Sequence, residues 1–142
     1  MNNSDYVIMN ATILLVDDDP DDLFILSDAF RTLDHSCEII EAYDGDAALL
    51  LLDELGKRDV VPDLIVVDIN MPVLDGRELL KLLKTNDDYK EVPVVMYTTS
   101  SNVFDRLHCE QYQVELFIKP STLESIMQVV GQMLQYCKKR AA

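Results

Sequence analysis

Short apolar runs alternate along the chain with segments in which apolar residues recur every three or four positions. The runs fit buried strands, whereas the wider spacing is typical of helices that bury one face. The pattern predicts strands at about 12–16, 38–43, 63–67, 92–98 and 115–118, and helices at about 20–33, 45–56, 76–85, 102–109 and 122–137. Five strands that alternate with five helices predict a doubly wound, parallel α/β sheet.

The ends of the predicted helices carry recognisable signals. Asp19 and Pro20 suit the cap and the first position of the first helix, and Gly56 suits the end of the second. Asp21 and Asp22 are interpreted as helix-start residues, because negative charge is favourable near a helix amino terminus.

Polar residues stand at or directly after the ends of four of the five predicted strands, at the point where each apolar run ends. They are Asp17 and Asp18 after ILLV, Asp68 after LIVV, Thr98 after VVMY and Lys119 after LFI. In an open parallel sheet, the carboxyl ends of the strands line the crevice where ligands bind. Three carboxylates, a hydroxyl and an amine that meet there would bind a divalent cation and a phosphoryl group. The alternative is a purely structural network of ion pairs.

Length and composition are consistent with one globular domain. The 142 residues, 49% of them hydrophobic, can form a substantial core, and no apolar run is long enough to cross a bilayer. The first residues lack the features of a secretory signal, so we expect a cytoplasmic protein. The three cysteines are odd in number and widely spaced, which favours reduced thiols over disulfides.

The chain is strongly acidic, with 26 acidic and 12 basic residues and a net charge of −14. Such a surface repels polyanions, which argues against nucleic-acid binding. The basic cluster of Lys138, Lys139 and Arg140 lies where the last helix is expected to end, and cations there oppose the helix dipole favourably. We therefore expect neither a nucleic-acid nor a membrane partner.

Four motifs occur in the order typical of one known family. They are the acidic pair of LLVDDD, the strand end of VVDINMPVLDG, the hydroxyl of VMYTTS and the lysine of FIKPS. Together they resemble the receiver domain of two-component response regulators, the family of the bacterial chemotaxis regulator, over residues 12–137. The resemblance implies a flavodoxin-like sheet of five strands in the order 2-1-3-4-5, and a signalling protein rather than an enzyme.

The resemblance also implies a phosphoacceptor with a metal site beside it. Asp68 would accept the phosphoryl group, with Mg2+ as the cofactor. Asp18 would bind the ion directly, Asp17 would help to hold it through water, and Asn70 would contribute its backbone carbonyl.

Further residues would act on the phosphoryl group itself. Thr98 would donate a hydrogen bond to one phosphoryl oxygen, and Lys119 would pair with another. Ser100 stands where the family adjusts the access of water to the phosphate. The bond between Lys119 and Pro120 is cis in the family, which a proline permits at small cost.

The expected organisation is a short arm at 1–11, a receiver domain at 12–138 and a tail at 139–142, which leaves no room for an output module. Such a receiver would take its phosphoryl group from a sensor histidine kinase or a histidine phosphotransfer protein. It would signal to a downstream protein target by changing its binding surface.

The resemblance places the output surface on the helix at 102–109, the strand at 115–118 and the last helix. That surface would include Leu107 and Phe117. Many receivers carry an aromatic residue that moves inward on activation, and Leu116 occupies its position here. Because side chains alternate along a strand, Phe117 is expected to face the opposite side of the sheet.

Two other functions fit part of the pattern. A haloacid-dehalogenase-type phosphatase also uses an aspartate nucleophile with Mg2+, and Asp17 and Asp19 form a D-x-D, but residues 20–22 depart from that family's motif. A flavodoxin-like binding module would share the sheet, yet DDDPDD repels a phosphate unless a metal intervenes. Neither alternative accounts for Thr98 and Lys119 at their strand ends.

Overall fold

The sheet in the computed structural model, which describes residues 10–99 and 101–141, has five parallel strands. Their order is β2-β1-β3-β4-β5, so the predicted order is confirmed. Their bounds are Thr12–Val16 for β1, Glu38–Ala42 for β2, Leu64–Val67 for β3, Val94–Thr98 for β4 and Glu115–Ile118 for β5. The three inner strands are almost wholly buried, as their continuous apolar runs require.

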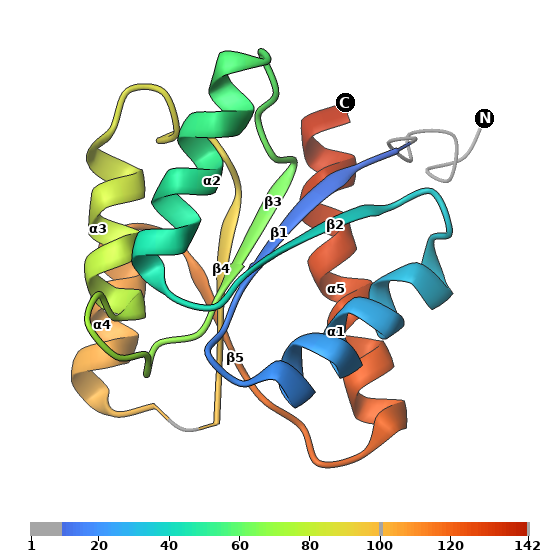
Figure 1. The fold of residues 1–142 in the computed structure, drawn as a ribbon. Helices are drawn as coiled ribbons and strands as arrows, with labels where there is room; N and C mark the ends of the chain where they lie inside the picture. The colour runs from blue at the N-terminus through green and yellow to red at the C-terminus, as the bar shows by residue number, and fades with distance from the viewer. Residues whose placement is uncertain (1–9, 100, 142) are drawn as a thin grey trace.

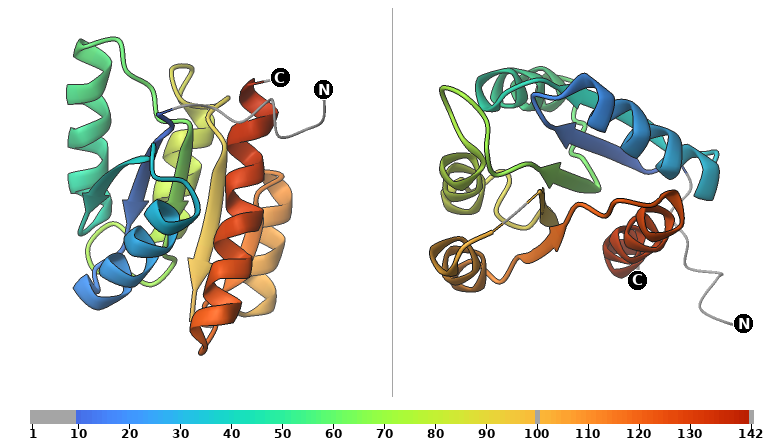
Figure 2. Two further views of the ribbon diagram at one scale, coloured as in Figure 1. Left: turned by 90° about the vertical axis from the view of Figure 1, so that its right-hand side faces the viewer. Right: turned by 90° about the horizontal axis from the view of Figure 1, so that it is seen from below.

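Five helices cover the two faces of the sheet. They are α1 (Pro20–Leu33), α2 (Gly45–Lys57), α3 (Gly76–Thr85), α4 (Val103–Gln111) and α5 (Leu123–Ala141). α1 and α5 pack side by side on one face, and α2, α3 and α4 cover the other (Figure 1, Figure 2). The predicted doubly wound α/β fold is therefore confirmed.

Four helices begin at an acidic or amide side chain that accepts a backbone N–H of the first turn: Asp19, Asp44, Asp75 and Asn102. The predicted cap at Asp19 and the proline at the first helical position are confirmed. The predicted end at Gly56 is one residue early, because α2 continues to Lys57. Lys57 lies 3.5 Å from Asp53 one turn before it, which favours the extra helical residue.

Two hydrophobic clusters fill the space between the sheet and the helices. The cluster beneath α2, α3 and α4 includes Leu14, Ile65 and Leu79, and the cluster beneath α1 and α5 includes Ile13 and Phe30. Successive strand residues contribute to opposite clusters, so the sheet is buried on both faces.

β5 shows this alternation at two residues whose orientation was predicted. Leu116 packs against the α2–α3–α4 cluster and Phe117 belongs to the α1–α5 cluster, so their opposite orientation is confirmed. However, Phe117 is only 7% exposed, and the expectation that it contributes to an output surface is wrong. Burial against α5 explains the difference, whereas the next residue, Ile118, is exposed.

The three cysteines, Cys37, Cys109 and Cys137, are buried and form no disulfide with one another. Burial raises the pKa of the Cys37 thiol to about 12 and that of Cys109 to about 11, so these two groups stay protonated. Within the described residues, every helix is too short or too polar to cross a membrane.

Candidate functional site

Three carboxylates meet at the carboxyl ends of β1 and β3, at the lower end of the sheet in Figure 1. Val16 of β1 pairs with Val67 of β3, so the residues that follow them, Asp17 and Asp68, lie at the same level. One oxygen of each of Asp17, Asp18 and Asp68 lies within 4.8 Å of the others. Asp17 and Asp68 are buried and Asp18 is exposed, so the group opens to solvent on one side.

The two buried carboxyl groups resist ionisation. Burial, and then the nearby Asp17, raise the pKa of Asp68 to about 6, and Lys119 opposes this increase. Burial likewise raises the pKa of Asp17, despite its hydrogen bond from Lys119. A cation among these oxygens would favour their charged forms. Three carboxylates are hard oxygen donors of the kind that Mg2+ and Mn2+ prefer, so the residues fit a divalent ion.

Lys119 places a positive charge beside this group. Its Nζ lies 2.7 Å from Asp17 Oδ2, 2.8 Å from Asp22 Oδ2 and 3.7 Å from Asp68 Oδ2. Burial alone would lower the pKa of Lys119, but the hydrogen bonds to Asp17 and Asp22 outweigh it and raise the pKa. The ammonium is therefore charged, and it is bound more closely to Asp17 and Asp22 than to Asp68.

Among the described residues, Asp22 also lies at this site, although the sequence alone does not predict it there. It was interpreted as a helix-start residue, yet its carboxylate accepts a hydrogen bond from Lys119. A signal was present: Leu26 and Ala29, four and seven residues further on, are buried on the inner face of α1. The same spacing places Asp22 on that face, next to the sheet.

Thr98 lies at the end of β4 and is fully buried. Its Oγ1 accepts a hydrogen bond from Asn70 Nδ2 at 3.5 Å, which links the ends of β4 and β3. The backbone N–H of Lys119 donates to the carbonyl of Thr98 at 2.7 Å, so the ends of β4 and β5 are also joined. The structure thus brings all six predicted site residues to one edge of the sheet. Ser100 lies outside the described residues.

The loop between β3 and α3 is tightly constrained. The N–H of Gly76 donates to the carbonyl of Ile69 at 2.8 Å, which folds the loop back onto the residue after Asp68. A Cβ at position 76 would collide with the carbonyl oxygen of Asp68 and lie 2.7 Å from Cα of Ile69. Val73 in the same loop has a φ of 66°. A branched side chain in this region costs about 1–2 kcal/mol, so the surrounding contacts must hold it there.

The expected cis bond between Lys119 and Pro120 is not found. The described part of the chain contains no cis peptide bond, so this expectation is wrong. A trans bond is the lower-energy form for a proline by about 0.5–1 kcal/mol.

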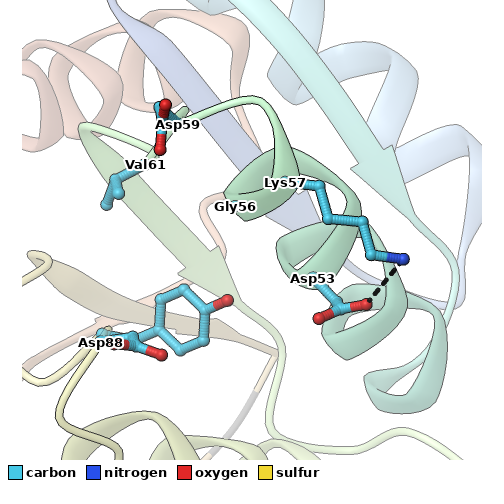
Figure 3. Close-up of a pocket in the computed structure, with 7 residues that line it drawn as sticks. Asp53, Gly56, Lys57, Asp59, Val61 and Asp88 are labelled. Atoms are coloured by element: carbon cyan, nitrogen blue, oxygen red, sulfur yellow. Dashed lines mark ion pairs between the residues drawn. The ribbon is translucent and has the colours of Figure 1, made fainter.

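A separate hollow of about 440 Å³ lies near the amino ends of the strands, between the end of α2 and the segment before β4 (Figure 3). It is lined by Asp53, Gly56, Lys57, Asp59, Val61, Asp88 and Tyr89. Among the described residues that line it, there is no residue of the predicted site. The carboxylate group at the other end of the sheet therefore remains the candidate site.

Comparison with known proteins agrees with this arrangement. The family model of the response regulator receiver domain matches residues 13–131. Response regulator Rcp1 from Synechocystis sp. is 35% identical over 121 residues, which are 83% of this chain and 82% of Rcp1. The probable methanogenesis regulatory protein FilR2 from Methanothrix harundinacea is 32% identical over 87% of this chain and 81% of its own length.

Solved structures show the same fold. The phosphorylated cyanobacterial phytochrome response regulator RcpA has a TM-score of 0.81 and 29% identity, over 93% of this chain and 96% of RcpA. The Mn(2+)-bound form of response regulator Rcp1 has a TM-score of 0.74 and 34% identity, over 86% of this chain and 90% of that chain. By its sequence, its strand order and the match of the family model, the chain belongs to the response regulator receiver domain family.

Proposed function

We propose that Asp68 is the phosphoacceptor of this receiver and that Asp17, Asp18 and Asp68 hold Mg2+ beside it. One observation carries the proposal: the three carboxylates share one small volume at the end of β3, with the ammonium of Lys119 3.7 Å from Asp68. The backbone carbonyl of Asn70 would complete the protein's ligands. Rcp1, which is similar to this chain, has been solved in a Mn(2+)-bound form, and this supports the binding of a divalent ion by the receiver.

The chemistry requires positioning and charge neutralisation more than covalent work by the protein. A carboxylate oxygen of Asp68 attacks the phosphorus of a phosphohistidine, and the P–N bond breaks. The imidazole nitrogen keeps the electron pair of that bond and takes up a proton. Mg2+, when bound, supplies positive charge to the transferred oxygens.

The protein's own side chains hold the product. Lys119 pairs with one phosphoryl oxygen, and the hydroxyl of Thr98 donates a hydrogen bond to another. The acyl phosphate on Asp68 is then hydrolysed by water, which restores the carboxylate and ends the signal. The receiver thus assists its own phosphorylation and dephosphorylation instead of acting on a separate substrate.

The proposed partners are a sensor histidine kinase or a histidine phosphotransfer protein and a downstream protein target. The target would bind the face formed by α4, β5 and α5, where Val103, Phe104 and Leu107 are exposed on α4. We place this exchange in the cytoplasm, where the three cysteine thiols would stay reduced.

The direct test is chemical phosphorylation. The protein is incubated with acetyl phosphate or phosphoramidate, with Mg2+ or with EDTA, and intact mass and peptide mapping report the modification. We expect one phosphoryl group on Asp68, dependent on Mg2+, in the parent and in the control Asp53→Asn, which removes an exposed carboxylate of α2. Equal labelling of Asp68→Asn would contradict the assignment.

A further inference from the structure

The ammonium of Lys119 is shared unequally among three carboxylates. Its two short contacts, 2.7 Å and 2.8 Å, go to Asp17 and Asp22, and the contact to Asp68 is longer at 3.7 Å. An ammonium has three N–H donors, and two of them are used by Asp17 and Asp22. Lys119 therefore donates hydrogen bonds to Asp17 and to Asp22 of α1, and it contacts the proposed phosphoacceptor through a longer ion pair.

Asp22 is not the cap of α1, although its negative charge in the first turn is itself favourable. The cap of the helix is Asp19, whose side chain accepts the N–H of Asp21. Asp22 also lies outside the carboxylate group that fits a metal. Its side chain is about one-third exposed and that of Lys119 is 10% exposed, so the pair is shielded from solvent mainly at the lysine.

We propose that Asp22 is a positioning residue that holds Lys119 before phosphoryl transfer and releases it to the phosphoryl group afterwards. This inference rests on the proposed role of Asp68 as the phosphoacceptor. The phosphoryl oxygens add negative charge on the Asp68 side of the ammonium and compete with Asp22 for its donors. The hydrogen bond between Lys119 and Asp22 is then made only before phosphorylation. Its loss couples the phosphorylation of Asp68 to α1, the helix that carries Asp22.

A bond made in one state alone shifts the equilibrium between the two states when it is removed. Without the Asp22 carboxylate, Lys119 loses an interaction in the unphosphorylated state and keeps its pairing with the phosphoryl group. Asp22→Asn should therefore bind beryllofluoride, a phosphoryl mimic, more tightly than the parent in the presence of Mg2+. Because the lost interaction is a charged hydrogen bond that is partly exposed to solvent, we expect the affinity for beryllofluoride to increase about three- to tenfold.

The neighbouring residue provides a matched control. Asp21 lies in the same turn of α1, and Asp21→Asn removes the same charge without touching the bond to Lys119. If the loss of one negative charge near the site were sufficient, Asp21→Asn and Asp22→Asn would both bind beryllofluoride more tightly than the parent. Asp22→Glu keeps the charge and should restore an affinity close to that of the parent. Asp22→Ser also removes the carboxylate but introduces a smaller side chain than Asp22→Asn, and it should increase the affinity for beryllofluoride in the same way.

A second measurement follows the lysine itself in the absence of metal. The 15N and proton shifts of the Lys119 ammonium report its hydrogen bonds, and they should change in Asp22→Asn and Asp22→Ser but remain at parent values in Asp21→Asn. Addition of beryllofluoride and Mg2+ to the parent should shift the same signal. Thermal unfolding of each variant checks that it is folded.

The outcomes separate the two proposals. If Asp22→Asn and Asp22→Ser bind beryllofluoride no more tightly than Asp21→Asn, the pair with Lys119 is kept in both states and the positioning role is wrong. If the parent and Asp21→Asn fail to bind beryllofluoride, or if Asp68 is not phosphorylated, the proposed function itself fails.

Discussion

Arg77 of α3 donates a hydrogen bond from Nε to Asp105 Oδ1 of α4 at 2.5 Å, and so joins the two helices by an ion pair. Asp105 is buried and also accepts the backbone N–H of Asn102, which closes a capping box at the start of α4. The buried residues of α4 are Asp105 and Cys109, so the helix has little apolar contact of its own. Its attachment to the domain therefore depends strongly on this charged pair.

Loss of the cation should destabilise the domain. Arg77→Met leaves the Asp105 carboxylate buried without its partner, and we expect a loss of about 2 kcal/mol. This is less than the 3–5 kcal/mol of a fully buried pair, because Arg77 is 37% exposed. Urea unfolding measures the change. Arg106→Met, which removes an exposed cation from α4, is the control.

The pH dependence of the same variant provides a further check. Burial raises the pKa of Asp105, but the hydrogen bonds from Arg77 and Asn102 outweigh it and lower the pKa below its usual value. The stability from Asp105 is thus present above the unfolded pKa of about 3.9 and is lost as the pH falls through the folded value. Arg77→Met should lose more stability at pH 7 than in acid. An equal loss at both would count against the pair.

The contribution of Asp68 to stability should have the opposite pH dependence to that of Asp105. Its folded pKa of about 6 lies above the unfolded value, so the folded state binds more protons between the two and stability falls as the pH rises through this range. Without metal at pH 7.5, Asp68→Asn should be more stable than the parent by about 2 kcal/mol. Urea unfolding in EDTA at several pH values tests this, with Asp53→Asn as the control. A less stable Asp68→Asn at pH 7.5 would refute the expectation.

The metal site predicts a separate response to Mg2+. An ion that binds only the folded state raises the melting temperature as its concentration increases. Asp18 is exposed, so Asp18→Asn should change the metal-free stability by less than about 0.5 kcal/mol but greatly weaken the effect of Mg2+. Thermal scans across a Mg2+ titration measure both. The control is Asp21→Asn, whose melting temperature should increase with Mg2+ as that of the parent does. The same increase in Asp18→Asn would show that Asp18 is not part of the metal site.

The conformational change that follows phosphorylation should depend on Thr98 more than on Leu116. Thr98 lies beside Asn70 at the site, whereas Leu116 packs among the residues beneath α2, α3 and α4. We expect Thr98→Ala to reduce the beryllofluoride-induced NMR shifts on α4 and β5 more than Leu116→Ala does. The stability of each variant is measured separately, because Leu116→Ala also removes core contacts. Normal shifts in Thr98→Ala together with lost shifts in Leu116→Ala would reverse the assignment.

Hydrophobic periodicity was sufficient to predict the ten elements and the meeting of the polar strand ends. Asp17 and Asp68 could be found because each directly follows an apolar run, and a buried strand determines where its next residue lies. Asp22 was missed because an acidic residue in the first turn of a helix already has a local explanation in the helix dipole. Its pairing with Lys119, 97 positions away in the chain, depends on how α1 packs on the sheet.

Expectations transferred from the family alone were less secure. The isomer of the Lys119–Pro120 bond is set by the local chain path, and the structure has it trans. The alternation of β5 correctly placed Phe117 opposite Leu116, but its burial depends on the packing of α5, which alternation does not describe.

The close approach of Gly76 to the backbone of Asp68 and Ile69 has a genetic consequence. Every base change at the first or second position of a glycine codon either introduces a side chain or ends translation. At this position even a methyl group displaces the backbone that carries Asp68, while every charge and hydroxyl of the site stays in the sequence. A screen for loss of signalling should therefore recover substitutions at Gly76 alongside those at the polar residues. The substitutions at Gly76 would act by displacing the backbone of the site, not by removing one of its polar groups.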